Sequence, residues 1–136
     1  MEKESAITYQ LDLIPSAEQV IELYKNAGLP RPVEDAARIE KMYQHSNLVV
    51  TAWQGEELVG VSRCITDWAW SCYLADLAVK TACHASGIGK ELIRLTKEKL
   101  GKECMLLLLS VPGAMEYYPK VGFTKLDNSF IINREQ

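Results

Sequence analysis

The 136-residue chain lacks the features that mark membrane, secreted and nucleic-acid-binding proteins. No apolar run approaches the roughly 20 residues that a membrane-spanning helix needs, and no apolar segment follows Met1 as it would in a signal peptide. Arginine and lysine form no basic stripe, and the formal net charge is −3. These absences predict one cytoplasmic domain over residues 1–136, with neither a membrane nor a nucleic acid as partner.

The chain also lacks a cysteine pattern that would bind metal. Cys64, Cys72, Cys83 and Cys104 are widely spaced and include no C-x-x-C pair. A structural zinc site needs four clustered ligands, so we expect no metal. Without a secretion signal the cysteines are expected to be reduced, with Cys64, Cys72 and Cys104 serving as small core residues.

Apolar periodicity predicts an α/β domain with a mixed sheet. The expected strands are 7–13, 48–53, 58–65, 72–79 and 104–110, with one or two more within 123–132. The expected helices are 16–28, 33–44, 87–100 and 112–118, the first of them opened by a capping box of Ser16 and Gln19. Hairpins followed by a strand–helix–strand unit imply a central sheet of six to seven strands flanked by about four helices.

The most informative segment runs from Asp76 to Ile93. It has the pattern of a buried strand, a turn with Gly87 and Gly89, and an amphipathic helix. Glycines at a helix start leave backbone N–H groups unshielded, and the helix dipole adds positive potential, so the segment predicts a site for a phosphate or pyrophosphate. A Walker A loop is excluded because Glu91 follows Gly89-Lys90, and a dinucleotide fingerprint is excluded because Leu92 replaces its third glycine.

This segment resembles the phosphate loop of the GNAT superfamily of N-acetyltransferases, Gln/Arg-x-x-Gly-x-Gly/Ala, which stands here as His84-x-x-Gly87-x-Gly89. A second segment, 114–123, resembles that family's Ala-x-x-Phe-Tyr-x-x-x-Gly-Phe signature. The resemblance covers roughly residues 48–136 and implies the GNAT fold. Its main departure is His84, which could still donate to a phosphate oxygen, or could be an ordinary surface residue.

The resemblance implies that acetyl-CoA is the co-substrate. In the GNAT fold two neighbouring parallel strands separate, and acetyl-CoA lies in the gap, with its pantetheine arm on the first strand and its pyrophosphate on the glycine turn. By resemblance, the cofactor-binding residues are Leu77, Ala78, Val79, His84, Ala85, Ser86, Gly87, Ile88, Gly89 and Lys90.

Two catalytic roles follow from the same resemblance. Tyr118 would be the acid that protonates the leaving CoA thiolate, while Tyr117 takes the place of the signature's Phe and is expected to pack inward. Asp76 could remove the proton of the attacking ammonium group. It could equally be a fixed structural carboxylate, and the sequence leaves this open.

The acceptor site is the least defined part of the prediction. Trp68, Trp70 and Tyr73 cluster at a turn and could line it, with Arg31 on a loop that closes over it; an aromatic face attracts a cationic amine. The tryptophans could instead form an apolar lid or a homodimer contact. The expected function is N-acetylation of a small-molecule amine by direct attack in a ternary complex. The alternative is a non-catalytic acyl-CoA-binding module.

Overall fold

The computed structural model describes residues 6–136, which form a five-stranded mixed sheet in the order β1-β2-β3-β4-β5. The strands are β1 Ile7–Gln10, β2 Leu48–Gln54, β3 Glu57–Thr66, β4 Ser71–Val79 and β5 Met105–Leu107. Each of the strands β1 to β3 pairs antiparallel with the next strand in the sequence, and β5 pairs parallel with β4. The prediction of a mixed α/β sheet is confirmed, with five strands in place of six to seven.

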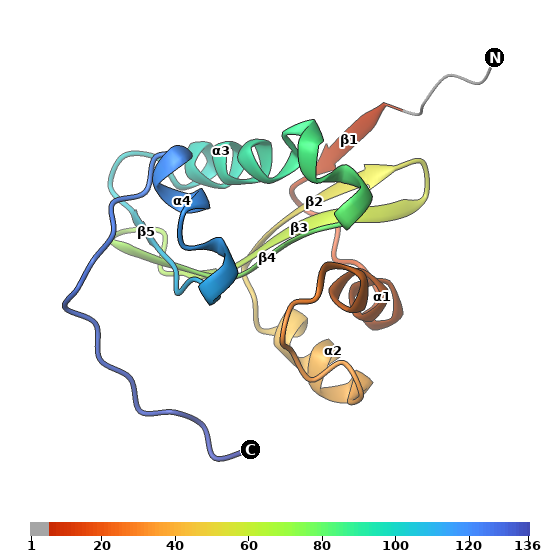
Figure 1. Cartoon of the computed structure of the whole chain (residues 1–136), viewed down its shortest axis with the longest axis horizontal. Coiled ribbons are helices and arrows are strands. Elements are labelled where there is room, and N and C mark those ends of the chain that lie inside the picture. The colour runs from red at the N-terminus through yellow and green to blue at the C-terminus, as the bar shows by residue number, and fades with distance from the viewer. Residues whose placement is uncertain (1–5) are drawn as a thin grey trace.

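The helices cover both faces of this sheet. They are α1 Ala17–Ala27, α2 Ala36–Gln44, α3 Ile88–Leu100 and α4 Tyr117–Lys120, with 3₁₀ helices η1 Thr81–Ser86 and η2 Pro112–Ala114. The predicted capping box is confirmed, because Ser16 Oγ accepts from the Gln19 amide and the Gln19 side chain accepts from the Ser16 amide. Helix α3 lies on one face of the sheet, and α1 and α2 lie on the other (Figure 1).

A separate apolar core fills each side of the sheet. Strand β2 alternates between them: Leu48, Val50 and Ala52 pack with the α3 side, whereas Val49 packs with α1 and α2. This alternation is the period-two pattern of a strand buried on both faces. Gly60 on β3 allows α3 to approach closely, since a Cβ there would lie 3.0 Å from the Ile88 side chain. The close packing fixes the start of α3 beside the end of β4.

The C-terminal segment differs from the prediction. No strand forms within 123–132, and the chain from residue 123 to 136 runs as an irregular trace that ends near α2 (Figure 1). Its side chains Phe130 and Ile132 are fully exposed. Apolar content alone does not make a strand, because the backbone groups also need a partner strand. The expected strand 104–110 is likewise shortened to the residues that pair with β4.

The cysteines behave as predicted. Cys64, Cys72 and Cys104 are buried, and none of the four cysteines forms a disulfide. Over residues 6–136, no helix combines the length and the apolar character needed to cross a membrane. The same residues contain no group of three or more histidine, cysteine or acidic side chains placed to hold a metal ion.

Candidate active site

The strands β4 and β5 pair over three residues and then separate. Their pairing runs from Ser71–Met105 to Tyr73–Leu107, and no further pairs follow toward Val79. Beyond Tyr73, the edge of β4 that faces β5 therefore has no strand partner among the described residues. A cavity of about 350 Å³ occupies this gap. It is lined by Ala27, Gly28, Leu29, Arg31, Leu74, Ala75, Leu77, Ala78, Val79, His84, Gly89, Leu108, Leu109, Val111, Gly113, Ala114, Tyr117 and Tyr118.

The lining of this cavity suits an extended ligand with an anionic end. Among the residues described, none that lines it is acidic, while Arg31 and His84 can both carry positive charge. Most of the other side chains are apolar, and the free edge of β4 offers peptide groups in extended geometry. An amide-containing chain can pair with such an edge as an added strand would. Three residues predicted to hold pantetheine, Leu77, Ala78 and Val79, all lie on this wall.

The predicted phosphate loop is a 3₁₀ helix followed by the start of α3. Ala85 and Ser86 belong to η1, and in a 3₁₀ helix the backbone amides donate hydrogen bonds to carbonyl groups three residues earlier. Gly87 adopts a left-handed φ of 80° and caps α3 without a side-chain hydrogen bond. The free amides at this end are those of the first turn of α3, at Ile88, Gly89 and Lys90. Of the amides from Ala85 to Lys90 that were predicted to hold the pyrophosphate, those of residues 88–90 lie in the first turn of α3, where helix amides lack an intrahelical partner.

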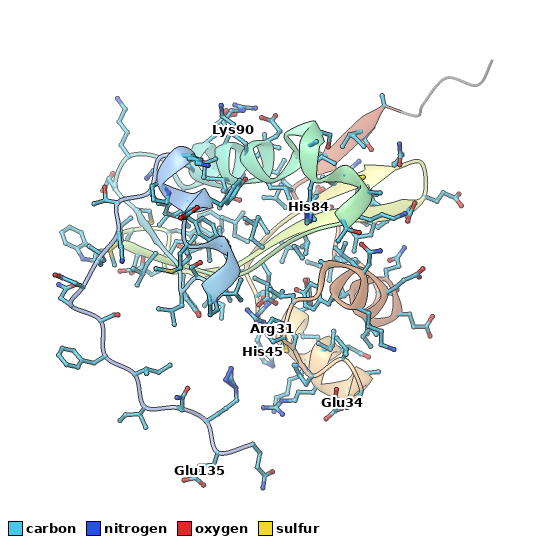
Figure 2. The ribbon with its side chains drawn as sticks, viewed as in Figure 1. Arg31, Glu34, His45, His84, Lys90 and Glu135 are labelled. Carbon is cyan, nitrogen blue, oxygen red and sulfur yellow. The ribbon has the colours of Figure 1, made fainter. Side chains whose placement is uncertain are left out.

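The two positive side chains predicted to bind the cofactor, His84 and Lys90, lie on different sides of this turn. Lys90 is exposed on α3 and does not line the cavity, whereas His84 lies below α3 beside the sheet (Figure 2). A His84 ring nitrogen, Nε2, lies 2.9 Å from the Val79 carbonyl oxygen. Since a carbonyl oxygen can only accept, Nε2 is the donor of this bond, which ties His84 to the end of β4. Lys80 forms an ion pair with Glu57.

Helix α4 contributes Tyr117 and Tyr118 to the lining of the cavity. A Cβ at Gly89 would lie 2.7 Å from the Tyr117 hydroxyl oxygen, so the glycine permits α4 to approach the start of α3. Tyr117 is 37% exposed and contacts this turn, rather than packing inward as predicted.

Replacing Gly89 with alanine should therefore destabilise the fold by about 1 kcal/mol, the low end of the cost of overpacking, because the partly exposed Tyr117 ring can shift. Urea denaturation measures the change. Adding Tyr117→Phe should recover most of the loss, since the next ring atom lies 3.6 Å away. Gly113→Ala is the control, because a Cβ there meets nothing within 4 Å. If the effects of the substitutions at 89 and 117 on the free energy of unfolding simply add, the contact between these two residues is contradicted.

Tyr118 lies on the same cavity wall. Its ring makes edge-to-face contacts with Tyr117 and Phe123, with centroids 5.3 and 5.5 Å apart. Burial raises the pKa of the Tyr118 phenol above its usual value, and nearby Tyr117 adds to this, with a smaller opposing effect of Arg31. The phenol therefore stays protonated at neutral pH. No hydrogen bond of its hydroxyl is found within residues 6–136, so the proton is available to a ligand.

Asp76 sits at the centre of a buried ion-pair network and is 1% exposed. One carboxylate oxygen accepts from Arg31 Nε at 2.6 Å. The other accepts from Arg63 Nε at 2.7 Å and from the Tyr24 hydroxyl at 2.6 Å. Burial would raise the pKa of Asp76, but the hydrogen bonds and charges of the two arginines outweigh it, and the pKa lies below its usual value. This geometry favours the structural carboxylate of the two alternatives.

A second cavity, of about 400 Å³, adjoins the first. Its lining residues are Arg31, Pro32, Arg38, Met42, Arg63, Tyr73, Ala75, Asp76, Leu109, Ser110, Val111 and Arg134. Of the predicted acceptor residues, Arg31 lines both cavities and Tyr73 lines the second. Trp68 and Trp70 line neither, and Trp70 is 74% exposed. Their turn is held by Asp67 Oδ1, which accepts three successive backbone amides.

Sequence reasoning missed several residues around the second cavity. Arg63 pairs in register with Asp76 across β3 and β4, and Tyr24 and Tyr43 join them by hydrogen bonds. An arginine inside the apolar strand 58–65 was the available signal, because a buried charge needs a partner. Arg38 and Arg134 gave no signal, since nothing in their local sequence places them near each other.

Comparisons with known proteins agree with the fold. The chain resembles a probable acetyltransferase from meticillin-resistant Staphylococcus aureus (20% identity, 95% of this chain and 100% of that chain, TM-score 0.82). It also resembles a GNAT family acetyltransferase from Streptococcus pneumoniae TIGR4 (25% identity, 96% and 100%, TM-score 0.76). An aminoglycoside acetyltransferase from an uncultured soil metagenomic sample is similar as well (19% identity, 96% and 96%, TM-score 0.70).

No curated protein matches the chain significantly. The family model described as the acetyltransferase (GNAT) domain matches residues 16–134, nearly the whole chain. The matched range includes both signatures, the separated strands and the cavity between them. The chain therefore belongs to the GNAT acetyltransferase family.

Proposed function

We propose that the protein transfers an acetyl group from acetyl-CoA to the primary amine of a small molecule, by direct attack in a ternary complex. The observation that carries the proposal is the separation of β4 from β5 beyond Tyr73, which leaves a free strand edge leading from Tyr118 to the start of α3. A non-catalytic acyl-CoA-binding role uses the same cavity, and the experiments below distinguish the two.

The residues present fit the co-substrate. The free edge of β4 at Leu77 to Val79 would pair with the amides of the pantetheine arm. The amides of the first α3 turn would hold the pyrophosphate, with the positive end of the helix dipole behind them. The absence of a Cβ at Gly89 makes room at that turn for the Tyr117 hydroxyl. When bound, acetyl-CoA supplies an activated thioester carbonyl.

Tyr118 is the proposed acid. A phenol that remains protonated at neutral pH can give its proton to the departing thiolate. The amine must be neutral to attack, and a primary amine with a pKa near 10 is mostly protonated at pH 7. Because both Asp76 oxygens are engaged with arginines and Tyr24, we propose that the amine loses its proton to water rather than to Asp76.

A small-molecule acceptor is supported by the size of the two cavities, about 350 and 400 Å³, which lies in the range of small-molecule sites. The first cavity lies between the sheet, α4 and the loop that carries Arg31, and the second lies between the sheet, α2 and the same loop. The metagenomic relative, an aminoglycoside acetyltransferase, has been crystallised with sisomicin, which is also a small molecule. The C-terminal segment also contributes one residue, Arg134, to the lining of the second cavity.

Calorimetric titration tests the cofactor part of the proposal. CoA and acetyl-CoA should bind with a dissociation constant in the micromolar range, about −8 kcal/mol, whereas ATP and NAD should bind far more weakly. ATP shares the adenine and phosphates but lacks the pantetheine arm, so it is the matched control for the β4 edge. Equal binding of ATP and CoA would contradict the assignment of the cavity to pantetheine.

A further inference from the structure

We infer that the acceptor is an amine that also carries an anionic group, a carboxylate or a phosphate, and that this group binds in the second cavity. The inference rests on the proposed function and names its substrate class. The chain has five arginines, and four of them line this one cavity: Arg31, Arg38, Arg63 and Arg134. None of its ten lysines does.

The arginines come from four separate parts of the fold. Arg31 lies on the loop between α1 and α2 and is placed between the sheet and α2 (Figure 2). Arg38 is in α2, Arg63 is in β3, and Arg134 is in the C-terminal segment. The chain as a whole has a net charge of −3, so a cavity lined by four arginines has the opposite sign of charge to the rest of the protein. Like charges that gather in one cavity repel each other unless an anion lies between them.

The protein itself supplies only part of the compensating charge. Asp76 is the one acidic side chain lining the cavity among the described residues, and it is shared by Arg31 and Arg63. Over residues 6–136, Arg38 and Arg134 form no ion pair with a carboxylate side chain, although Arg38 Nη2 donates at 3.0 Å to an oxygen of the carboxyl group of Gln136, the last residue of the sequence. Arg134 thus has no counter-ion among the described residues, and Arg38 has no side-chain counter-ion.

Arg63 also retains an unused donor. Its Nε binds Asp76 and its Nη1 binds Ser46 Oγ, but no hydrogen bond of Nη2 is found in the described part of the chain. No fully buried side-chain nitrogen or oxygen there lacks a partner, so Nη2 is not sealed off. Arginine's planar fork matches carboxylate and phosphate oxygens, which makes this set of donors suited to an anion.

The position of the second cavity suits an acceptor. It shares Arg31, Ala75, Leu109 and Val111 with the first cavity, so one molecule can reach from the arginines toward Tyr118. The anionic group would be held by the arginines while the amino group enters the space beside the thioester. The positive lining disfavours an ammonium ion, which leaves the amine in the neutral form that attacks. It equally disfavours polycationic acceptors.

Matched pairs of acceptors test the inference. An amino acid is compared with its amide, and phosphoethanolamine with ethanolamine, each pair differing in the anionic group; spermidine represents polycations. The anionic member should have the higher kcat/KM, by on the order of tenfold. The amide has the less basic amine and more of the reactive form, so preference for the amino acid cannot come from basicity. The two pairs separate carboxylate from phosphate recognition.

Arginine variants locate the effect. Arg38→Gln and Arg134→Gln should each raise the KM for the preferred anionic acceptor by about tenfold and leave the KM for acetyl-CoA unchanged. Arg94→Gln is the control, because the fifth arginine lies on α3 and pairs with Glu91 and Glu98 outside the cavity. Circular dichroism verifies that the variants fold.

The outcomes separate this inference from the proposed function. If CoA binds and spermidine or the neutral members are acetylated better than the anionic ones, the acceptor class is wrong and the transferase assignment stands. An unchanged KM in both Arg38 and Arg134 variants would also overturn the inference. If no amine is acetylated although CoA binds, the proposed catalysis fails, and with it the acceptor class.

Discussion

Replacing Tyr118 with phenylalanine should lower kcat by on the order of 100-fold or more, which is the usual contribution of a positioned general acid. The phenol lies on the wall of the cavity between β4 and β5, and burial keeps it protonated. Loss of the hydroxyl removes the proton donor for the thiolate but keeps the ring. Turnover is measured by the release of free CoA thiol at saturating acetyl-CoA and amine.

The substitution should leave the structure intact. The Tyr118 hydroxyl has no hydrogen bond within the described residues, and the edge-to-face contacts with Tyr117 and Phe123 need only the ring. Affinity for CoA, measured by titration, should therefore change by no more than about twofold, because the lost interaction forms only as the thiolate departs. Tyr9→Phe makes the same change on β1, away from the cavity, and should retain full turnover.

Three results would contradict the acid role. A Tyr118→Phe enzyme with near-normal kcat would show that the thiolate leaves without this proton. A wild-type protein that binds CoA but releases no thiol with any amine would favour the non-catalytic alternative, in which Tyr118 only packs against the ligand. Parallel losses of kcat and CoA affinity would indicate that Tyr118 binds the cofactor rather than acting on the leaving group.

Local sequence patterns predicted most of the sheet and three helices. The capping box at Ser16 and Gln19, the hairpin of β2 and β3, and the glycine turn before α3 each depend on neighbouring residues. Such features depend on residues a few positions apart, so they can be predicted from the sequence alone. The chain order then placed the glycine turn after β4, which is where the cavity begins.

Features that depend on distant partners were not predictable. Residues 104–109 are all apolar, and nothing in this pattern shows that pairing with β4 ends at Leu107. The segment 123–132 is apolar enough for a strand but has no partner in the structure. The convergence of four arginines on one cavity likewise joins residues up to 103 positions apart, 31 to 134, and no local pattern reveals it.

Replacing Asp76 with asparagine should destabilise the protein by about 3 kcal/mol, the low end of the cost of breaking a buried ion pair, because it leaves the buried charge of Arg63 and the partly buried charge of Arg31 without their carboxylate. Both guanidinium groups lie within 2.7 Å of Asp76, and its side chain is fully buried. Urea denaturation at neutral pH measures the loss. Asp35→Asn is the control: asparagine is an equally good N-cap, so the bond from the Arg38 amide is kept.

The pH dependence of the free energy of unfolding is a second, independent test of the structural role of Asp76. The folded pKa of Asp76 lies below the value near 4 of an unfolded aspartate, so its stabilisation is fully present above about pH 4 and is lost as the pH falls through the folded pKa. The stability difference between the wild type and Asp76→Asn should shrink over that range. A base would behave differently: Asp76→Asn would then keep its stability, lose turnover, and lose the acid limb of the pH–rate profile. Because three donors already occupy the Asp76 oxygens, we expect the stability effect and not the catalytic one.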